Sequence, residues 1–236
     1  MSAFLRLFNR ELLRVARRPS QLVSTLAMPI MMWIFLGAGF AGTMQDGSFT
    51  AHLAPGMAIL VVMFATIFVG MSLIEDRHMG FLQGVLVSPA PRWAVAGSKL
   101  ASAAVLGAVQ GVPLLLMAPL LGEGSGLGVL LASVVLLLTA VAIGGFGLAL
   151  AWWIDSSRGY HGVMMILIFP LWLLSGAVFT DDTAAGWIVA VSRVNPIGWC
   201  RTTADAAMNG TLGSVPLASL GCILFALAGA LAATRT

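Results

Sequence analysis

The sequence has little charge, and the charge it has is unevenly placed. Only 9% of the 236 residues are Asp, Glu, Lys or Arg, whereas soluble domains carry about a quarter. Long stretches hold no ionisable residue, and the charged residues lie between them. Because a charge is costly at the centre of a bilayer and tolerated at its edge, this distribution indicates a membrane protein. The scarcity of charge also argues against nucleic-acid binding, since no basic patch exists outside one short N-terminal arm.

Three further absences limit the chemistry. A phosphate-binding loop needs Gly-x-x-x-x-Gly-Lys-Ser/Thr, but Lys99 is the single lysine and follows Ser98, so we expect ATP to bind on another chain. The three histidines lie in separate segments, whereas zinc needs three or four convergent ligands. Cys200 and Cys222 match no metal motif, and Cys222 lies in an apolar run, which argues against a disulfide. We therefore expect no catalytic residue, no metal and no cofactor in this chain.

Six uncharged stretches are long enough to cross a bilayer, which takes about 20 helical residues. They are residues 22–40, 53–74, 100–121, 127–151, 163–179 and 215–233. The first is longer than the core of a usual signal peptide, so we expect it to be retained. The predicted fold is an all-α polytopic membrane protein of six transmembrane helices, forming one permease-like domain over residues 1–236.

The connecting segments predict the orientation. If the N-terminus is cytoplasmic, ten of the twelve Lys and Arg residues fall on the cytoplasmic side, and only Arg193 and Arg201 fall outside. Positive residues favour the cytoplasmic side of a membrane. We therefore expect both termini in the cytoplasm and the protein in the bacterial cytoplasmic (inner) membrane.

The N-terminal arm, residues 4–18, predicts an amphipathic helix lying in the membrane interface. Apolar and basic residues each recur at helical spacing, on different faces. The apolar ones are Phe4, Phe8, Leu12 and Val15, and the basic ones are Arg6, Arg10, Arg14 and Arg17. Such a helix places its arginines on anionic lipid. The arm either signals topology alone or also contacts a cytoplasmic partner.

Residues 75–99 form the most informative connection. Charged residues open it, an apolar-periodic segment with residues 81, 82, 85 and 86 on one face follows, and Pro89 and Pro91 end it. This pattern predicts a short cytoplasmic helix at the membrane surface. Its apolar face requires a cover, which is either a partner protein or the lipid surface and the ends of the spans.

The same connection resembles the first cytoplasmic loop of the membrane subunits of type-2 ABC exporters, a family that includes drug, lipid and polysaccharide exporters. The similarity covers Glu75, Arg77, Gly80, Leu82, Leu86, Ser88, Pro89, Arg92, Gly97 and Lys99. The chain differs at Phe81, where the family has Thr or Ser, and at Gln83, where it has Glu. A second similarity lies at the fifth span, in residues 169–176, and at Asn195-Pro196-Ile197-Gly198-Trp199.

This resemblance implies a homodimer, or a pair with a similar permease, bound to two ATPase subunits that hold ATP and magnesium. The loop would be the coupling helix, with Glu75, Arg77, Gly80, Phe81, Leu82, Gln83, Leu86, Ser88, Pro89 and Arg92 in ATPase coupling. Residues 180–214 would form short re-entrant helices that cap the exit, together with span five. The implied cap residues are Pro170, Ser175, Gly176, Trp187, Ile188, Val191, Asn195 and Pro196. Interfacial anchoring is an equally good interpretation of Trp187.

Within the spans, Gly107 and Gly111 form a Gly-x-x-x-Gly pattern that favours close helix packing inside the bundle. Gln110 is a lone polar residue of the third span, which we expect to hydrogen-bond a neighbouring helix.

The predicted function is the permease subunit of an ATP-binding cassette exporter. Uncharged spans cannot compensate a buried charge, so we expect a lipophilic or amphipathic substrate, namely a drug, a lipid or a lipid-linked glycan. The alternatives are a secondary transporter, a membrane assembly or sensory subunit that transports nothing, and a haem-export-type permease. Ion-coupled carriers usually keep ionisable residues within the spans, and this chain shows none there.

Overall fold

The computed structural model describes residues 3–40, 49–87, 91–122, 124–179 and 184–234. The regular structure in these ranges is entirely helical. The long helices are α2 (Pro19–Gly39), α3 (Phe49–His78), α5 (Arg92–Leu115), α7 (Gly126–Trp153), α8 (Ser157–Trp172) and α11 (Pro216–Thr234). The shorter α-helices are α1 (Ala3–Ala16), α4 (Phe81–Val87), α6 (Met117–Leu120), α9 (Gly186–Val194) and α10 (Pro196–Met208).

Six of the described helices, or helix pairs, are long and apolar enough to cross a membrane. This confirms the six spans predicted from the sequence. α5 continues through α6, and α8 continues through the π-helical turn Leu173–Ala177, to complete their spans.

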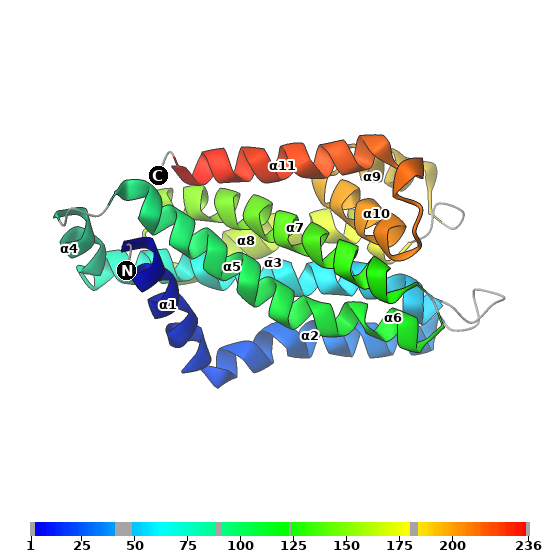
Figure 1. Ribbon diagram of the computed structural model, residues 1–236, viewed down its shortest axis with the longest axis horizontal. Helices are drawn as coiled ribbons and strands as arrows, with labels where there is room; N and C mark the ends of the chain where they lie inside the picture. The colour runs from blue at the N-terminus through cyan, green and yellow to red at the C-terminus, as the bar shows by residue number, and fades with distance from the viewer. Residues whose placement is uncertain (1–2, 41–48, 88–90, 123, 180–183, 235–236) are drawn as a thin grey trace.

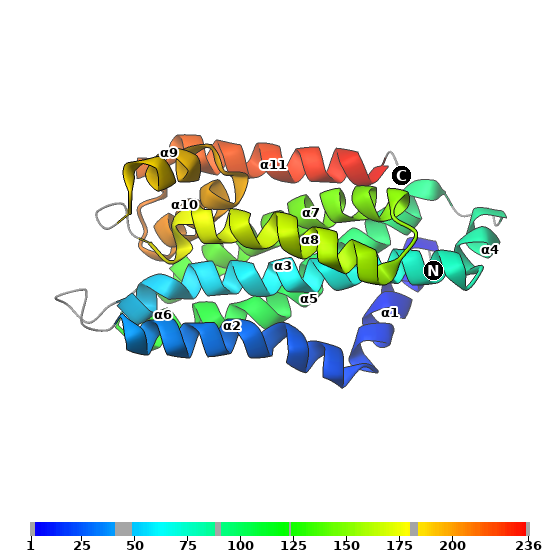
Figure 2. The same cartoon turned by 180° about the vertical axis from the view of Figure 1, so that it is seen from behind.

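The helices form a bundle in which α3 is the most buried span and packs against α2, α5, α7 and α8. Figures 1 and 2 show α2 along one edge of this bundle and α11 along the opposite edge. Both chain termini lie at the end of the bundle that carries α4, which we call the α4 end; α9 and α10 lie at the other end, which we call the α9 end (Figure 1). α1 turns sharply away from the direction of α2, and Pro19, at the first turn of α2, lies beside that bend.

Two helices extend beyond the spans expected from hydropathy. α3 is 30 residues long and ends only at His78, before Gly80, whose φ of +72° favours glycine. α5 begins at Arg92. Glu75, Arg77 and Lys99 therefore lie on long helices rather than in a loop, and only α4 with its short flanks connects the two spans.

Small residues allow the helices to approach closely. A Cβ added at Gly111 of α5 would lie 2.9 Å from Leu136 Cδ1 of α7 and 3.3 Å from Ala58 O of α3. A Cβ at Gly107 would lie 3.2 Å from Val62 Cγ2. This Gly-x-x-x-Gly pattern therefore packs within the bundle, as predicted.

Candidate functional site

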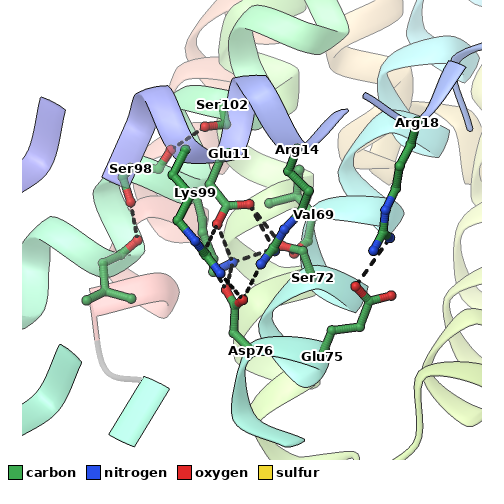
Figure 3. A network of polar contacts seen from close by, with 12 residues as sticks. Glu11, Arg14, Arg18, Val69, Ser72, Glu75, Asp76, Ser98, Lys99 and Ser102 are labelled. Carbon is green, nitrogen blue, oxygen red and sulfur yellow. Dashed lines mark hydrogen bonds and ion pairs between the residues drawn. The ribbon is translucent and has the colours of Figure 1, made fainter. Parts of the chain in front are cut away.

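A buried cluster of charged side chains joins three helices at the α4 end. Glu11 comes from α1, Asp76 from α3 and Lys99 from α5 (Figure 3). Lys99 Nζ donates to Asp76 Oδ2 at 2.8 Å, to Ser72 Oγ at 2.8 Å and to Glu11 Oε1 at 3.2 Å. The side chains of Lys99 and Asp76 are only 3% and 2% exposed. Charges buried to this degree are tolerated only when they are paired and hydrogen-bonded.

Two arginines of α1 complete the charge cluster. Arg10 Nη2 donates to Asp76 Oδ1 at 2.8 Å and Arg10 Nη1 to Glu11 Oε1 at 2.9 Å. Arg14 pairs with the same two carboxylates. Burial by itself lowers the pKa of Arg14, but its hydrogen bond to Asp76 and the nearby carboxylates raise that pKa above its ordinary value. The cluster therefore fixes α1 against α3 and α5.

The charge cluster also reaches α4. Arg10 Cζ lies 3.5 Å from the centre of the Phe81 ring, at the start of α4. A guanidinium over an aromatic ring is attracted to its negative face. Phe81, where the chain departs from the usual Thr or Ser of the resembled family, thus joins α4 to α1 through Arg10.

The structure places the remaining residues of the predicted coupling segment on two sides of α4. Leu82 is 5% exposed and belongs to the hydrophobic core, so it faces the bundle, which was one of the two alternatives for the apolar face. Gln83 and Gly84 are exposed, and Met79, just before α4, is 64% exposed. Leu86 lies on α4 and Arg92 begins α5; Ser88 and Pro89 lie outside the described residues.

The last turn of α3 contacts two further segments. Arg77 donates to the carbonyl oxygens of Trp152 and Ile154, at 2.9 Å and 2.8 Å, and to Asp155 Oδ1 at 3.0 Å. These contacts tie α3 to the connection between α7 and α8. Glu75 forms a more exposed pair with Arg18, at 3.3 Å.

At the α9 end, the Asn195-Pro196 pair has a definite structural role. Asn195 Oδ1 accepts a hydrogen bond from Ile197 N at 3.0 Å, and Pro196 occupies the first turn of α10. This is N-capping, with proline where no amide is needed. Asn195 Nδ2 also donates to Leu171 O at 2.6 Å, so the cap residue binds α10 to the end of α8.

The end of α8 is irregular. Pro170 lies inside the helix, and the π-helical turn that follows contains Gly176 with a φ of +80°. Ser175 Oγ donates to Trp172 O at 2.5 Å, and Trp172 Nε1 donates to Gly56 O of α3 at 2.8 Å. Asn195, which donates to Leu171 O, therefore lies beside the stretch of α8 that contains Pro170 and precedes Ser175 and Gly176.

α9 packs only partly against the rest of the chain. Trp187 is 63% exposed, whereas Ile188 and Val191 are half-buried. Beside α9 lies a cavity of about 800 Å³. Its lining includes Ser175, Gly176, Arg193, Trp199, Arg201 and Leu220.

The structure also shows contacts that the sequence did not predict. The charge cluster was missed, although Glu11 is the single acidic residue of the basic arm and Lys99 the single lysine. Cys200 and Cys222 are free, as expected, but their sulfur atoms lie 3.0 Å apart, between α10 and α11. Gln110 Oε1 has no hydrogen-bond partner among the described residues, so the expected bond to a neighbouring helix is not found.

Comparison with known proteins places this architecture in a family. The family model for the ABC-2 type transporter matches residues 2–208. The chain is 25% identical over 239 residues to the daunorubicin resistance ABC transporter permease protein DrrB1 of Streptomyces coeruleorubidus, covering 94% of this chain and 81% of that one. It is 25% identical over 199 residues to the putative transport permease ycf38 of Cyanophora paradoxa, covering 81% and 69%. It is 26% identical over 170 residues to Nodulation protein J of Rhizobium leguminosarum bv. viciae, covering 69% and 65%. The chain is therefore an integral membrane permease that belongs to the ABC-2 type transporter family.

Proposed function

We propose that this permease is the membrane subunit of an exporter driven by ATP, and that it works as a homodimer with two separate ATPase subunits. The observation that carries the proposal is the two-sided environment of α4. One side is held by the protein itself, through Leu82 in the core and Phe81 under Arg10. The other side presents Met79, Gln83 and Gly84 to the surroundings. A short helix held in this way suits docking to a second protein.

The contacts at the α4 end support a route from that docking surface to the spans. α4 follows α3 after a tight glycine turn at Gly80. Asp76 joins α3 to α1 and α5, and Arg77 joins it to the α7–α8 connection. A displacement of α4 by a closing ATPase would therefore move α3 together with α1, α5 and the α7–α8 connection.

The charge cluster also bears on the mechanism of energy use. Its two carboxylates face three basic side chains, and every member is ion-paired. A proton carrier needs an acidic group that can release and take up protons in a path. Carboxylates that are paired with three cationic side chains at the end of the bundle suit a structural role better than a role in proton transfer. This favours ATP hydrolysis over an ion gradient as the energy source of transport.

The substrate that fits best is a lipophilic or amphipathic molecule, leaving past the cap formed by α9, α10 and the π-helical turn of α8. The spans offer mainly apolar surface, which cannot compensate a free buried charge. The name of the Streptomyces relative refers to daunorubicin resistance, which makes amphipathic drugs the first substrates to test. The cavity beside Ser175 and Arg201 would be the outer end of the path.

The proposal is tested by changing the two sides of α4 separately. Met79→Asp puts an unpaired charge on the exposed side, at a cost to an interface of about 2–5 kcal/mol. We expect co-purification with the partner ATPase to fall more than about tenfold at a normal level of permease in the membrane. Met79→Leu, the matched apolar control, should retain the partner.

Leu82→Asp provides the contrasting variant. Because Leu82 lies in the core, its change should lower the stability of the permease itself, measured as thermal aggregation of the detergent-solubilised chain. If Met79→Asp and Gln83→Arg both leave ATPase binding and stimulation normal, α4 is only a connector and the proposed docking is wrong.

A further inference from the structure

A second cavity lies near the α4 end, between α1, α2, α3 and α5. It has a volume of about 410 Å³, within the range of small-molecule sites. Ser102 and Gln110 of α5 both line it, and eight helical residues span about 12 Å. The cavity therefore runs from the charge cluster toward the middle of the spans.

The lining changes character along this length. Near the mouth it contains Glu11 and Arg14 of the charge cluster and the Arg18–Glu75 pair (Figure 3). Between the cluster and Gln110, the lining from α3 and α5 is apolar and includes Ala65, Phe68 and Leu106. An occupant of this part of the cavity must therefore have a hydrocarbon body.

Gln110 is the exception in the apolar part. It is 6% exposed, it lines the cavity, and its Oε1 has no hydrogen-bond partner among the described residues. A buried polar atom without a partner costs free energy, so it marks a place where a partner belongs. Two other hydroxyls that line the same cavity already have acceptors: Ser102 donates to Ser98 O, and Thr25 donates to Gln21 O.

We infer that this cavity is a binding site for an amphipathic alcohol or phenol, whose hydroxyl bonds to Gln110 while its hydrocarbon body lies against Phe68 and Leu106. A hydroxyl both donates and accepts, so it satisfies the carboxamide in either orientation of the amide. The site lies within one copy of the chain, and it is independent of what the permease exports. It is also separate from the cavity beside Ser175 and Arg201 at the α9 end.

The test compares two photoreactive probes on the full chain in lipid nanodiscs. One is an alkyl diazirine with a hydroxyl, and the other is the same alkyl diazirine without it. Labelled peptides are mapped by mass spectrometry, and occupancy is corrected for partitioning into the lipid of protein-free discs. We expect saturable labelling on α3 and α5 around Phe68 and Leu106, with the alcohol favoured by about 2- to 10-fold.

Three variants make the result specific. Gln110→Leu should keep the labelling but abolish the preference for the alcohol. Ser102→Ala is the matched control in the same cavity, and it should keep the preference because its hydroxyl already bonds to Ser98 O. Leu106→Trp fills the cavity and should suppress labelling by both probes.

Two results would overturn the inference. One is an unchanged preference for the alcohol in Gln110→Leu. The other is unsaturable labelling of the exposed face of α2, at Val23 and Phe35, in place of the cavity, which would leave only lipid contact and a cavity filled with water.

Discussion

Asp76→Asn should release α1 from the bundle. Asp76 accepts from Arg10, Arg14 and Lys99 and is almost fully buried. Asparagine has nearly the same shape, so the change removes the charge and leaves the space filled. Lys99, equally buried, would then face Glu11 as its only remaining carboxylate in the cluster.

The magnitude follows from the burial of the partners. Removing one member of a buried ion pair costs about 3–5 kcal/mol. Arg10 is about one-third exposed, so water relieves part of this cost, and we expect the lower end, about 3 kcal/mol. That corresponds to a roughly 10²-fold increase in the population with α1 undocked.

Thiol labelling measures this population. Val15→Cys, in a background with Cys200→Ser and Cys222→Ser, places a single reporter on the buried side of α1. The labelling rate with a maleimide should rise roughly 10²-fold when Asp76→Asn is added. The control is Arg18→Gln, which breaks the exposed Arg18–Glu75 pair and should change the rate less than about fivefold, since exposed pairs contribute about 0–1 kcal/mol.

A second variant separates charge balance from loss of contact. Lys99→Met combined with Asp76→Asn removes one charge of each sign. The double variant should therefore lose less α1-docking free energy than the sum of the losses in the two single variants. If Asp76→Asn leaves the labelling rate of the reporter thiol on α1 at that of the parent, the charge cluster does not hold α1 in the bundle.

Three other predictions concern packing and the α9 end. Gly229→Ala should destabilise the chain by about 1–3 kcal/mol, because the added methyl group would clash with the backbone of Ala142 in α7. Gly39→Ala, which has open space around it, should leave the stability unchanged. Equal thermal stability of the two variants would contradict this prediction. Asn195→Ala should cost about 1–2 kcal/mol through loss of the α10 cap and the bond to Leu171 O, and Asn195→Asp should restore the cap alone; thermal denaturation in detergent measures both. Treatment with diamide, a thiol oxidant, should join Cys200 to Cys222 in a disulfide within one chain, because their sulfur atoms are 3.0 Å apart. The disulfide is detected as protection of Cys200 from alkylation, and Cys222→Ser should abolish this protection. Full alkylation of both thiols after oxidation would refute the prediction.

The sequence predicts the spans because hydropathy is a property of single segments. Six long apolar runs need six membrane crossings whatever their arrangement, and all six are present as helices. The helix ends are a different matter. α3 continues through Glu75, Asp76 and Arg77 because these charges find partners on other elements, and a pairing between distant segments is invisible in a hydropathy pattern.

The same limit explains the features of the site that were missed. The spacing of residues 81, 82, 85 and 86 predicts one apolar face, but periodicity does not say what covers it, and Leu82 is covered by the core of the bundle. Lys99 and Asp76 meet although 23 residues separate them. Asn195 and Pro196 could be singled out by resemblance, but their structural role depends on the position of Leu171 in another helix.

α3 offers a physical link between the two ends of the bundle. Four consecutive residues at its end point in different directions, because successive side chains rotate by about 100° around a helix. Accordingly Glu75 pairs with Arg18, just after α1, and Asp76 pairs with Lys99 of α5. Arg77 and His78 instead contact Asp155, between α7 and α8.

The same helix continues for 30 residues, about 45 Å at 1.5 Å per residue. Near its other end, Gly56 O accepts from Trp172, and a Cβ at Gly56 would lie 2.7 Å from Ala177 Cβ in the π-helical turn. Such tight contact leaves little room for α3 to move without the turn that carries Ser175 and Gly176. Under the function proposed above, a push on α4 would therefore reach the proposed cap through one continuous helix, α3.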